Sequence, residues 1–296
     1  MKNKNTWQKI KDNRYFYYFL VPFLLFFSIF MFFPILFSFY MSLHRWGGLG
    51  QATFSGLRNY IRIFTDSTFH TALKNTTFMW LTSTPLILGF ALILAVMLNQ
   101  KKVKFLKYFR VGYFMPFVTS TVVVGVIFTI LLDSSFGLVN FFIESIGFEK
   151  IPFLTSTTWS KISIVIVLTW RWVGYNTIIM LAGLQNIPET LYSAADIDGG
   201  TTFQKFFYIT VPIMKPIILF TFILSTIGSF QIFTEPYIMT GGGPMQSSLS
   251  VVQYLYNSGF QQFRMGYASA LSYVLFAIIF IASYFQIKIG SGEEGI

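Results

Sequence analysis

An all-α membrane protein is the fold class that the sequence predicts, and two observations predict it. The 296 residues are 54% hydrophobic and only 11% charged. This number of charged side chains is too small for the surface of a water-soluble globular protein. The chain therefore needs a bilayer as its solvent. Several apolar runs also exceed the roughly 18 residues that mark a membrane-spanning helix.

Six segments satisfy this test of length and apolarity. They lie at residues 16–40, 76–98, 108–132, 162–184, 211–232 and 267–287. The first run is too long for the apolar region of a cleavable signal, so it is interpreted as a membrane helix. An even number of spans places both termini on one side. We therefore expect a single transmembrane domain over 1–296, with an N-terminal segment at 1–14 and a six-helix core over 16–287.

The positive charges predict the orientation of these spans. Lysines and arginines precede the first span and crowd the second connection; they are Lys2, Lys4, Lys9, Lys11, Arg14, Lys101, Lys102, Lys104, Lys107 and Arg110. In this topology the inner segments hold twelve Lys and Arg, the outer segments seven and the membrane runs two. Because cytoplasmic loops carry the excess of positive charge, we expect both termini and the 185–210 loop to be cytoplasmic.

Several function classes lose support from the same residues. The positive residues sit beside membrane spans, so attraction to anionic lipid explains them better than nucleic-acid binding. No GxxxxGK[ST] loop and no GxSxG motif is present, so neither ATP binding through a P-loop nor hydrolase chemistry is expected. His44 and His70 lack a metal-ligand pattern around them. No acidic residue falls in the middle of a predicted span, which weakens a proton-coupled carrier.

The connection between the fourth and fifth spans carries the strongest pattern. A proline, Pro188, suits the first turn of a helix, and Ser193-Ala194-Ala195 give that helix a slim face. Gly199-Gly200 stop the helix, because glycine takes the left-handed conformation at a C-terminal cap. Thr201 with Gln204 forms a capping box that begins a second helix. Such a long loop with its own helices favours an interaction role over an ordinary connection.

This segment resembles the cytoplasmic coupling loop of the membrane subunits of binding-protein-dependent ABC importers. The matching order is Leu181-Ala-Gly-Leu-Gln-Asn-Ile-Pro188, Ser193-Ala-Ala195, Asp198-Gly199, an aromatic stretch and Ile209-Thr-Val-Pro212. The resemblance implies that the loop docks onto an ATPase, with Glu189, Ser193, Ala194, Ala195, Asp198 and Gly199 as coupling residues. Family members carry Glu where this chain has Ser193, and the resemblance implies that this carboxylate pairs with the ATPase. Glu189 lies one helical turn earlier on the same face and is the alternative source of that charge.

A second resemblance lies nearer the C-terminus. Thr240-Gly-Gly-Gly-Pro244, Ser247-Ser248, Tyr254-Leu-Tyr256 and Gly266-Tyr-Ala-Ser-Ala270 are similar to the outer loop and last helix of sugar-type permeases. Among these, the first permease of maltose and multiple-sugar systems is the most similar type. Phe54-Ser-Gly-Leu-Arg-Asn-Tyr60 also fits. The resemblance implies the type I importer permease fold.

Arg171 is the residue of the membrane runs that most needs an explanation. A lone cation at this depth costs about 2.5 kcal/mol or more on insertion scales, so it must face a cavity or a partner. Its neighbours Trp170 and Trp172 favour a sugar site, because aromatic rings stack on sugar faces. The other interpretation is a structural arginine held by Glu235 or by backbone carbonyls. The resemblance implies a substrate path with Tyr113, Arg171, Trp172, Ser229 and Gln231. Glu235, at the outer end of the fifth span, is the candidate ion partner of Arg171.

These patterns together predict a permease subunit of an ATP-driven oligosaccharide importer without catalysis, metal or cofactor of its own. The resemblance implies a heterodimer with a second permease, two ATPase subunits that bind ATP and Mg²⁺, an extracytoplasmic binding protein and surrounding lipid. Two alternatives stay open. A permease for a non-sugar solute would share the coupling loop, and an ion-coupled carrier would work without an ATPase.

Overall fold

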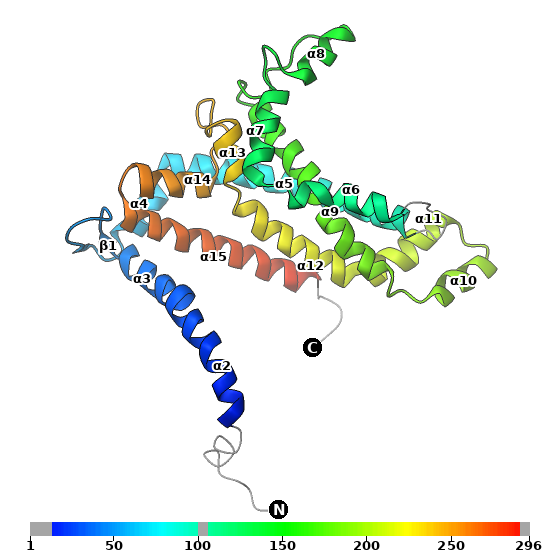
Figure 1. The fold of residues 1–296 in the computed structure, drawn as a ribbon, viewed down its shortest axis with the longest axis horizontal. Helices are drawn as coiled ribbons and strands as arrows, with labels where there is room; N and C mark the ends of the chain where they lie inside the picture. Colours follow the sequence, from blue (N-terminus) through cyan, green and yellow to red (C-terminus); the bar gives the residue numbers. More distant parts are fainter. Residues whose placement is uncertain (1–13, 100–105, 291–296) are drawn as a thin grey trace, which may run out of the picture. The chain divides into compact units, whose positions relative to one another are not determined.

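The computed structural model describes residues 14–99 and 106–290, and within them the regular secondary structure is helical apart from one small hairpin (Figure 1). The two termini and the lysines Lys2, Lys4, Lys9, Lys11, Lys101, Lys102 and Lys104 lie outside the described residues. The described chain divides into two units, Met1–Ile63 with Asn257–Tyr273, and Phe64–Tyr256 with Val274–Ile296. The predicted single domain over 1–296 stays a prediction.

The first unit begins with a long helix that is interrupted by one wider turn. It consists of α2 (Arg14–Phe27), the π-helical turn η1 (Ser28–Phe32) and α3 (Phe33–Ser42). Apart from the buried Met41 near its end, its described apolar side chains are exposed on all faces of the helix, which is typical of a helix whose solvent is lipid or another subunit. The hydroxyl of Tyr273 donates to the carbonyl of Ile35 at 2.6 Å and so ties this helix to the last one.

A small hairpin follows. Strand β1 (His44–Arg45) pairs antiparallel with β2 (Thr53–Phe54), so that His44 lies opposite Phe54. Next comes α4 (Arg58–Thr65), and the unit also contains the π-helical turn η3 (Asn257–Gln261) and the beginning of α15 (Met265–Gly290).

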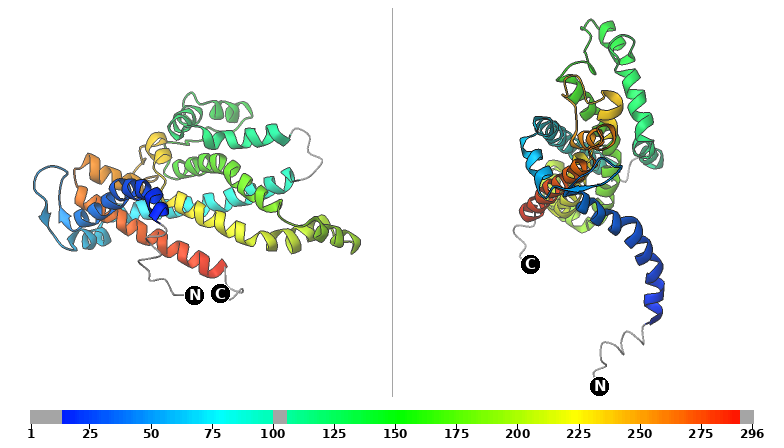
Figure 2. Two further views of the ribbon diagram at one scale, coloured as in Figure 1. Left: turned by 60° about the horizontal axis from the view of Figure 1, so that its bottom comes forward. Right: turned by 90° about the vertical axis from the view of Figure 1, so that its left-hand side faces the viewer.

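Two long helices form the centre of the second unit. Helix α5 (Ser67–Leu98) packs along α9 (Trp159–Leu184), and α12 (Val211–Phe230) packs against both (Figure 1). Small residues make the contact close: a Cβ added to Gly183 would collide with Ile217 of α12. The final part of α15 lies beside α12 (Figure 2), where Gln286 Nε2 donates to Thr226 Oγ1 at 2.7 Å. Without a hydrophobic force between helices in lipid, such close packing and polar contacts hold the bundle together.

Helix α5 begins nine residues before the predicted start at residue 76. Asp66 caps it by accepting hydrogen bonds from the backbone N–H groups of Thr68 and Phe69, at 2.9 and 3.3 Å. Residues 67–75 are largely polar, so an apolarity test leaves this first part of the helix out.

The predicted span at 108–132 is a pair of helices rather than one straight helix. Helix α6 (Leu106–Val118) and α7 (Thr121–Leu131) meet at an angle of 93°. Pro116 lacks the N–H that would continue the helix, and Ser120 is extended with ψ 127°. Over the described residues, five helices are long and apolar enough to span a membrane, or six if this pair is one span. The prediction of six spans is therefore confirmed with one of them bent.

The remaining elements are short. They are α8 (Leu138–Ser145), α10 (Glu189–Ile197), α11 (Thr202–Lys205), the π-helical turn η2 (Phe206–Thr210), α13 (Thr234–Met239) and α14 (Val251–Tyr256).

Candidate functional site

The loop between α9 and α12 folds into two short helices, as the sequence predicts (Figure 1). Pro188 is the N-cap residue of α10, one residue before the first turn predicted for it. Glu189 lies in that first turn, where the positive end of the helix dipole favours a carboxylate. Helix α11 and the turn η2 then lead into α12.

Two glycines form the tight turn that ends α10. Gly199 has φ +74°, the left-handed conformation that glycine adopts at little cost. Gly200 donates its N–H to the carbonyl of Ala195 at 2.8 Å, and a Cβ added there would approach the same oxygen to 2.8 Å. Thr201 and Gln204 make the predicted capping box of α11.

Side-chain contacts fix this loop to the helix bundle. Lys205 and Asp196 form an ion pair that bridges the two short helices. The hydroxyls of Tyr192 and Thr210 are 2.9 Å apart, and the Tyr192 ring packs on the apolar cluster formed by the last turns of α5 and α9 and the first turn of α12. These contacts connect α10 to the long helices of the bundle.

One face of α10 is apolar and exposed. Leu191, Ala194 and Ile197 follow one another at three-residue spacing, all of them are exposed, and Ile197 keeps 88% of its surface. Residues at this spacing lie on one side of a helix. Within the described chain this stripe is uncovered, which is typical of a surface that receives a partner.

The structure places the predicted coupling residues on this same loop. Glu189, Ser193, Ala194, Asp198 and Gly199 are exposed. Ala195, the remaining predicted coupling residue, is half-buried. The hydroxyl of Ser193 donates to the carbonyl of Glu189 at 3.1 Å, so it bonds within its own helix. The carboxylate of Glu189 lies one turn away from Ser193, as the hypothesis of a substitute charge requires.

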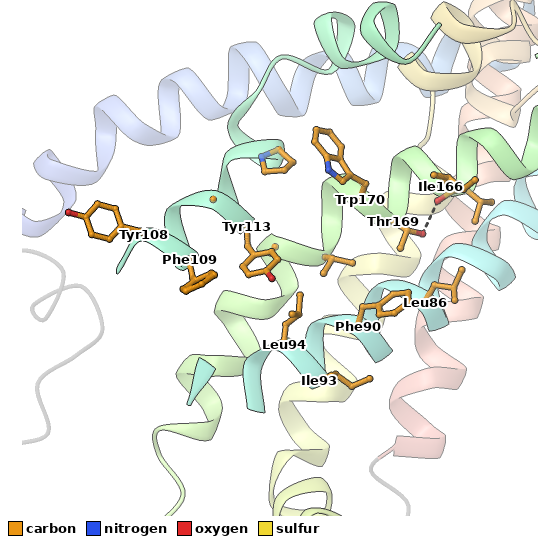
Figure 3. Close-up of a pocket in the computed structure, with 15 residues that line it drawn as sticks. Leu86, Phe90, Ile93, Leu94, Tyr108, Phe109, Tyr113, Ile166, Thr169 and Trp170 are labelled. Atoms are coloured by element: carbon orange, nitrogen blue, oxygen red, sulfur yellow. Dashed lines mark hydrogen bonds between the residues drawn. The ribbon is translucent and has the colours of Figure 1, made fainter. Parts of the chain in front are cut away.

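A cavity of about 1200 Å³ lies between α5, α6 and α9 (Figure 3). Its lining is mostly apolar; it consists of Leu86, Phe90, Ile93, Leu94, Tyr108, Phe109, Gly112, Tyr113, Pro116, Val165, Ile166, Thr169, Trp170, Val173 and Gly174. The rings of Tyr113 and Trp170 come from different helices and both line it. The Thr169 hydroxyl donates to the Val165 carbonyl at 2.7 Å. Aromatic rings with a polar end suit a ligand that has apolar faces and hydroxyl groups.

Gly174 brings the two walls of this cavity together. A Cβ added to it would overlap the carbonyl of Tyr113, so only glycine lets α9 approach α6 this closely. Helix crossings in membranes use small residues for this purpose.

Arg171 does not line this cavity and pairs with Glu235. Its Nη1 lies 3.7 Å from the Glu235 carboxylate, and its guanidinium lies 5.5 Å from the centre of the Trp172 ring. The two side chains are only 13% and 5% exposed. Each charge is therefore neutralised by the other in a buried place, which corresponds to the structural interpretation of Arg171.

The other predicted substrate residues lie apart from the large cavity. Trp172 and Ser229 line a second cavity of about 40 Å³, together with Tyr175, Asn176 and Ser225. The hydroxyl of Ser229 lies 3.4 Å from that of Thr84. Gln231 is exposed as the C-cap residue of α12, and it lines neither cavity.

The sequence analysis missed the close packing of α9 on α6 at Gly174, and it considered Trp170 only as a neighbour of Arg171. The signal for Gly174 is a glycine in the middle of an apolar span, one turn from Trp170. For the histidines, one ring nitrogen of each lies at hydrogen-bond distance from a backbone carbonyl: His44 Nδ1 is 2.7 Å from the Tyr40 oxygen, and His70 Nε2 is 2.9 Å from the Phe64 oxygen.

Comparison with known sequences places the chain in a family. Residues 87–288 match the family described as "Binding-protein-dependent transport system inner membrane component". The lactose transport system permease protein LacF of Rhizobium radiobacter is 40% identical over 90% of this chain and 91% of its own length. The arabinooligosaccharides permease AraP of Halalkalibacterium halodurans is 39% identical over 94% and 89%. The trehalose/maltose permease MalF of Thermococcus litoralis is 30% identical over 95% of each chain.

A solved structure has the same fold. A chain of a bacterial ABC transporter involved in the import of alginate superposes with a TM-score of 0.86, over 99% of this chain and all of that one, at 23% identity. The predicted importer-permease fold is thereby confirmed. The family match covers more than half of the sequence, and three relatives share at least 30% of their residues with it over nearly its whole length. The chain therefore belongs to the binding-protein-dependent transport system inner membrane components, as a multi-pass permease of the ABC type.

Proposed function

We propose that this chain is the permease subunit of an ATP-driven oligosaccharide importer and that it performs no catalysis. The relatives at 30–40% identity are named for lactose, arabinooligosaccharides and trehalose/maltose, which favours a carbohydrate over another solute. The observation that carries the mechanism is the exposed apolar stripe of α10 on a loop that is tied to the spanning helices.

The energy enters through partner subunits. Two ATPases bind ATP and Mg²⁺, and this chain uses no cofactor of its own. Leu191, Ala194 and Ile197 bury their apolar surface against an ATPase, while Glu189 supplies the charge that the family carries at the position of Ser193. Gly199 and Asp198 shape the end of the helix. Closure of the ATPase dimer then moves α10, and the Tyr192–Thr210 contact passes this movement to α9 and α12.

The sugar passes between this chain and a second permease after delivery by an extracytoplasmic binding protein. Tyr113 and Trp170 offer rings for stacking in the large cavity. Trp172 of α9 and Ser229 of α12 line the small second cavity, and Gln231 lies at the C-terminal end of α12. Arg171 and Glu235 neutralise one another and position Trp172, so they contribute to sugar transport only indirectly.

Uptake into proteoliposomes tests this function. The complete importer, with its binding protein outside and ATP inside, should accumulate a labelled oligosaccharide, and vanadate should stop the uptake. A labelled amino acid serves as the matched control solute. Uptake that resists vanadate and collapses with an ionophore would contradict an ATP-driven importer, and uptake of the amino acid alone would contradict a sugar importer.

The proposed orientation has the termini and the coupling loop in the cytoplasm of a bacterial cell. Because the chain has no cysteine, single cysteines at Gln51, Gln204 and Gln246 report their own side. An impermeant maleimide added to intact cells should label positions 51 and 246 but not 204. Labelling of position 204 alone would reverse the orientation.

A further inference from the structure

The first unit contains a polar cavity to which the proposed function assigns no part. Its volume is about 980 Å³, and it lies between the β1–β2 hairpin, α4 and the start of α15. It is lined by Arg45, Trp46, Gly47, Gln51, Thr53, Phe54, Ser55, Arg58, Asn59, Arg62, Phe263, Arg264 and Tyr267.

All the charged residues that line this cavity are positive. Four arginines line it, and its lining contains no Asp or Glu. The predicted topology assigns seven Lys and Arg to outer segments, so four of those seven meet at one place. Short outer loops usually avoid positive charge. Such a concentration favours an anionic ligand.

Backbone contacts hold the walls of the cavity in place. Asn59 Nδ2 donates to the carbonyls of Ser42 and His44, at 2.8 and 3.0 Å. The N–H of Gly266 donates to the Trp46 carbonyl at 3.1 Å, and a Cβ added to Gly266 would overlap the His44 carbonyl. The hairpin, α4 and the start of α15 are therefore fixed to each other before any ligand arrives.

The cavity lies close in sequence to the ends of two candidate spans. The first span ends at Ser42, three residues before Arg45, and the last begins at Met265, directly after Arg264. Leu57 and Ile61, one helical turn apart, are 64% and 65% exposed beside the arginines of α4. A basic face next to an exposed apolar face is typical of a helix at the headgroup level of a bilayer.

We propose that this cavity binds the phosphate headgroup of an anionic phospholipid, with the acyl chains lying along Leu57 and Ile61. Guanidinium groups match the phosphate geometry with paired hydrogen bonds. The aromatic rims at Phe54 and Phe263, 74% and 63% exposed, suit the glycerol and upper chain region. Phosphatidylglycerol is the headgroup class that we would test first.

Native mass spectrometry of the complete importer tests this proposal. The complex is taken from nanodiscs of equal phosphatidylglycerol and phosphatidylcholine, and the lipids that remain bound are counted. The wild-type complex should retain phosphatidylglycerol in preference to phosphatidylcholine. Equal retention of both lipids would overturn the proposal without any variant. Inorganic phosphate that displaces the retained lipid at millimolar concentration would instead identify a soluble anion as the ligand and would also overturn it.

A pair of variants locates the site. Arg45→Gln with Arg264→Gln removes two exposed guanidinium groups, whereas Lys74→Gln with Lys150→Gln removes two other exposed cations on the same predicted side but outside the cavity. Each cation near an anionic membrane contributes roughly fivefold in affinity, so the arginine pair should weaken retention by roughly 30-fold. The lysine pair should retain lipid as the wild type does.

An acidic face of the binding protein is the competing occupant of the cavity. If it fills the cavity, the arginine pair should weaken binding of that protein and leave lipid retention unchanged. That outcome would overturn the lipid proposal. Loss of lipid retention with unchanged affinity for the binding protein would support it.

Discussion

Replacement of Gly199 by valine should disconnect the coupling loop from ATP hydrolysis. Gly199 has φ +74°, and nothing lies within 4 Å of a Cβ built there. The Cβ of valine therefore meets no neighbour, and we expect its main effect to come from the backbone. The left-handed conformation costs an L-residue roughly 1–2 kcal/mol, and a β-branched residue is an outlier there. At about 1.4 kcal/mol for each factor of ten, the intact turn should become roughly 5–30 times less populated.

The assay is substrate-stimulated ATPase activity and uptake in the reconstituted importer, at matched amounts of assembled complex. Gly199→Asn is the matched control, because asparagine tolerates this conformation better than other non-glycine residues. We expect ATPase stimulation and uptake to fall together in the valine variant and to stay near normal in the asparagine variant. Full stimulation in an assembled valine variant would refute the reasoning, since a distorted α10 would then couple as well as a native one.

Three further changes test other contacts. Arg171→Gln or Glu235→Gln alone should reduce the yield of folded complex, since an unpaired buried charge costs about 3–5 kcal/mol, whereas the double change should restore it; a double variant that is no better than the singles would exclude mutual neutralisation. Gly174→Ala should lower the Tm of the complex through a steric cost of about 1–3 kcal/mol, while Gly89→Ala, which has open space for its methyl group, should leave the Tm unchanged or raise it. Ile197→Ser should weaken ATPase stimulation without loss of assembly, because the side chain is exposed in this chain; wild-type coupling in this variant would remove the apolar stripe from the docking surface.

Local signals in the sequence predicted most of the fold. Long apolar runs predict the spanning helices because a bilayer demands them, and Gly199-Gly200 with Thr201 and Gln204 predict the turn of the coupling loop from backbone chemistry alone. The bend at Ser120 was missed because the sequence stays apolar on both sides of it, although Pro116 in the preceding turn was a local signal for it. The early start of α5 was missed because its first turns are polar.

The arrangement of side chains in space was harder to predict from the sequence. Arg171 and Glu235 were a candidate pair because a buried charge needs a partner, although they are far apart in the sequence. The large cavity depends on Gly174 meeting a carbonyl of α6, which is a tertiary contact without a local pattern. In the same way, the arginines of the polar cavity come from separate loops, and only the fold brings them together.

Crosslinking from the coupling loop tests the central claim most directly, namely that α10 docks on a separate ATPase. In this cysteine-free chain, Ala194→Cys places one thiol on the exposed stripe, and Gln246→Cys places one in the predicted outer loop as a control. A thiol-to-amine crosslinker is applied to the assembled importer in membranes. We expect the ATPase subunit to be captured from position 194 and not from position 246. Capture from both positions alike, or from position 246 alone, would contradict the account.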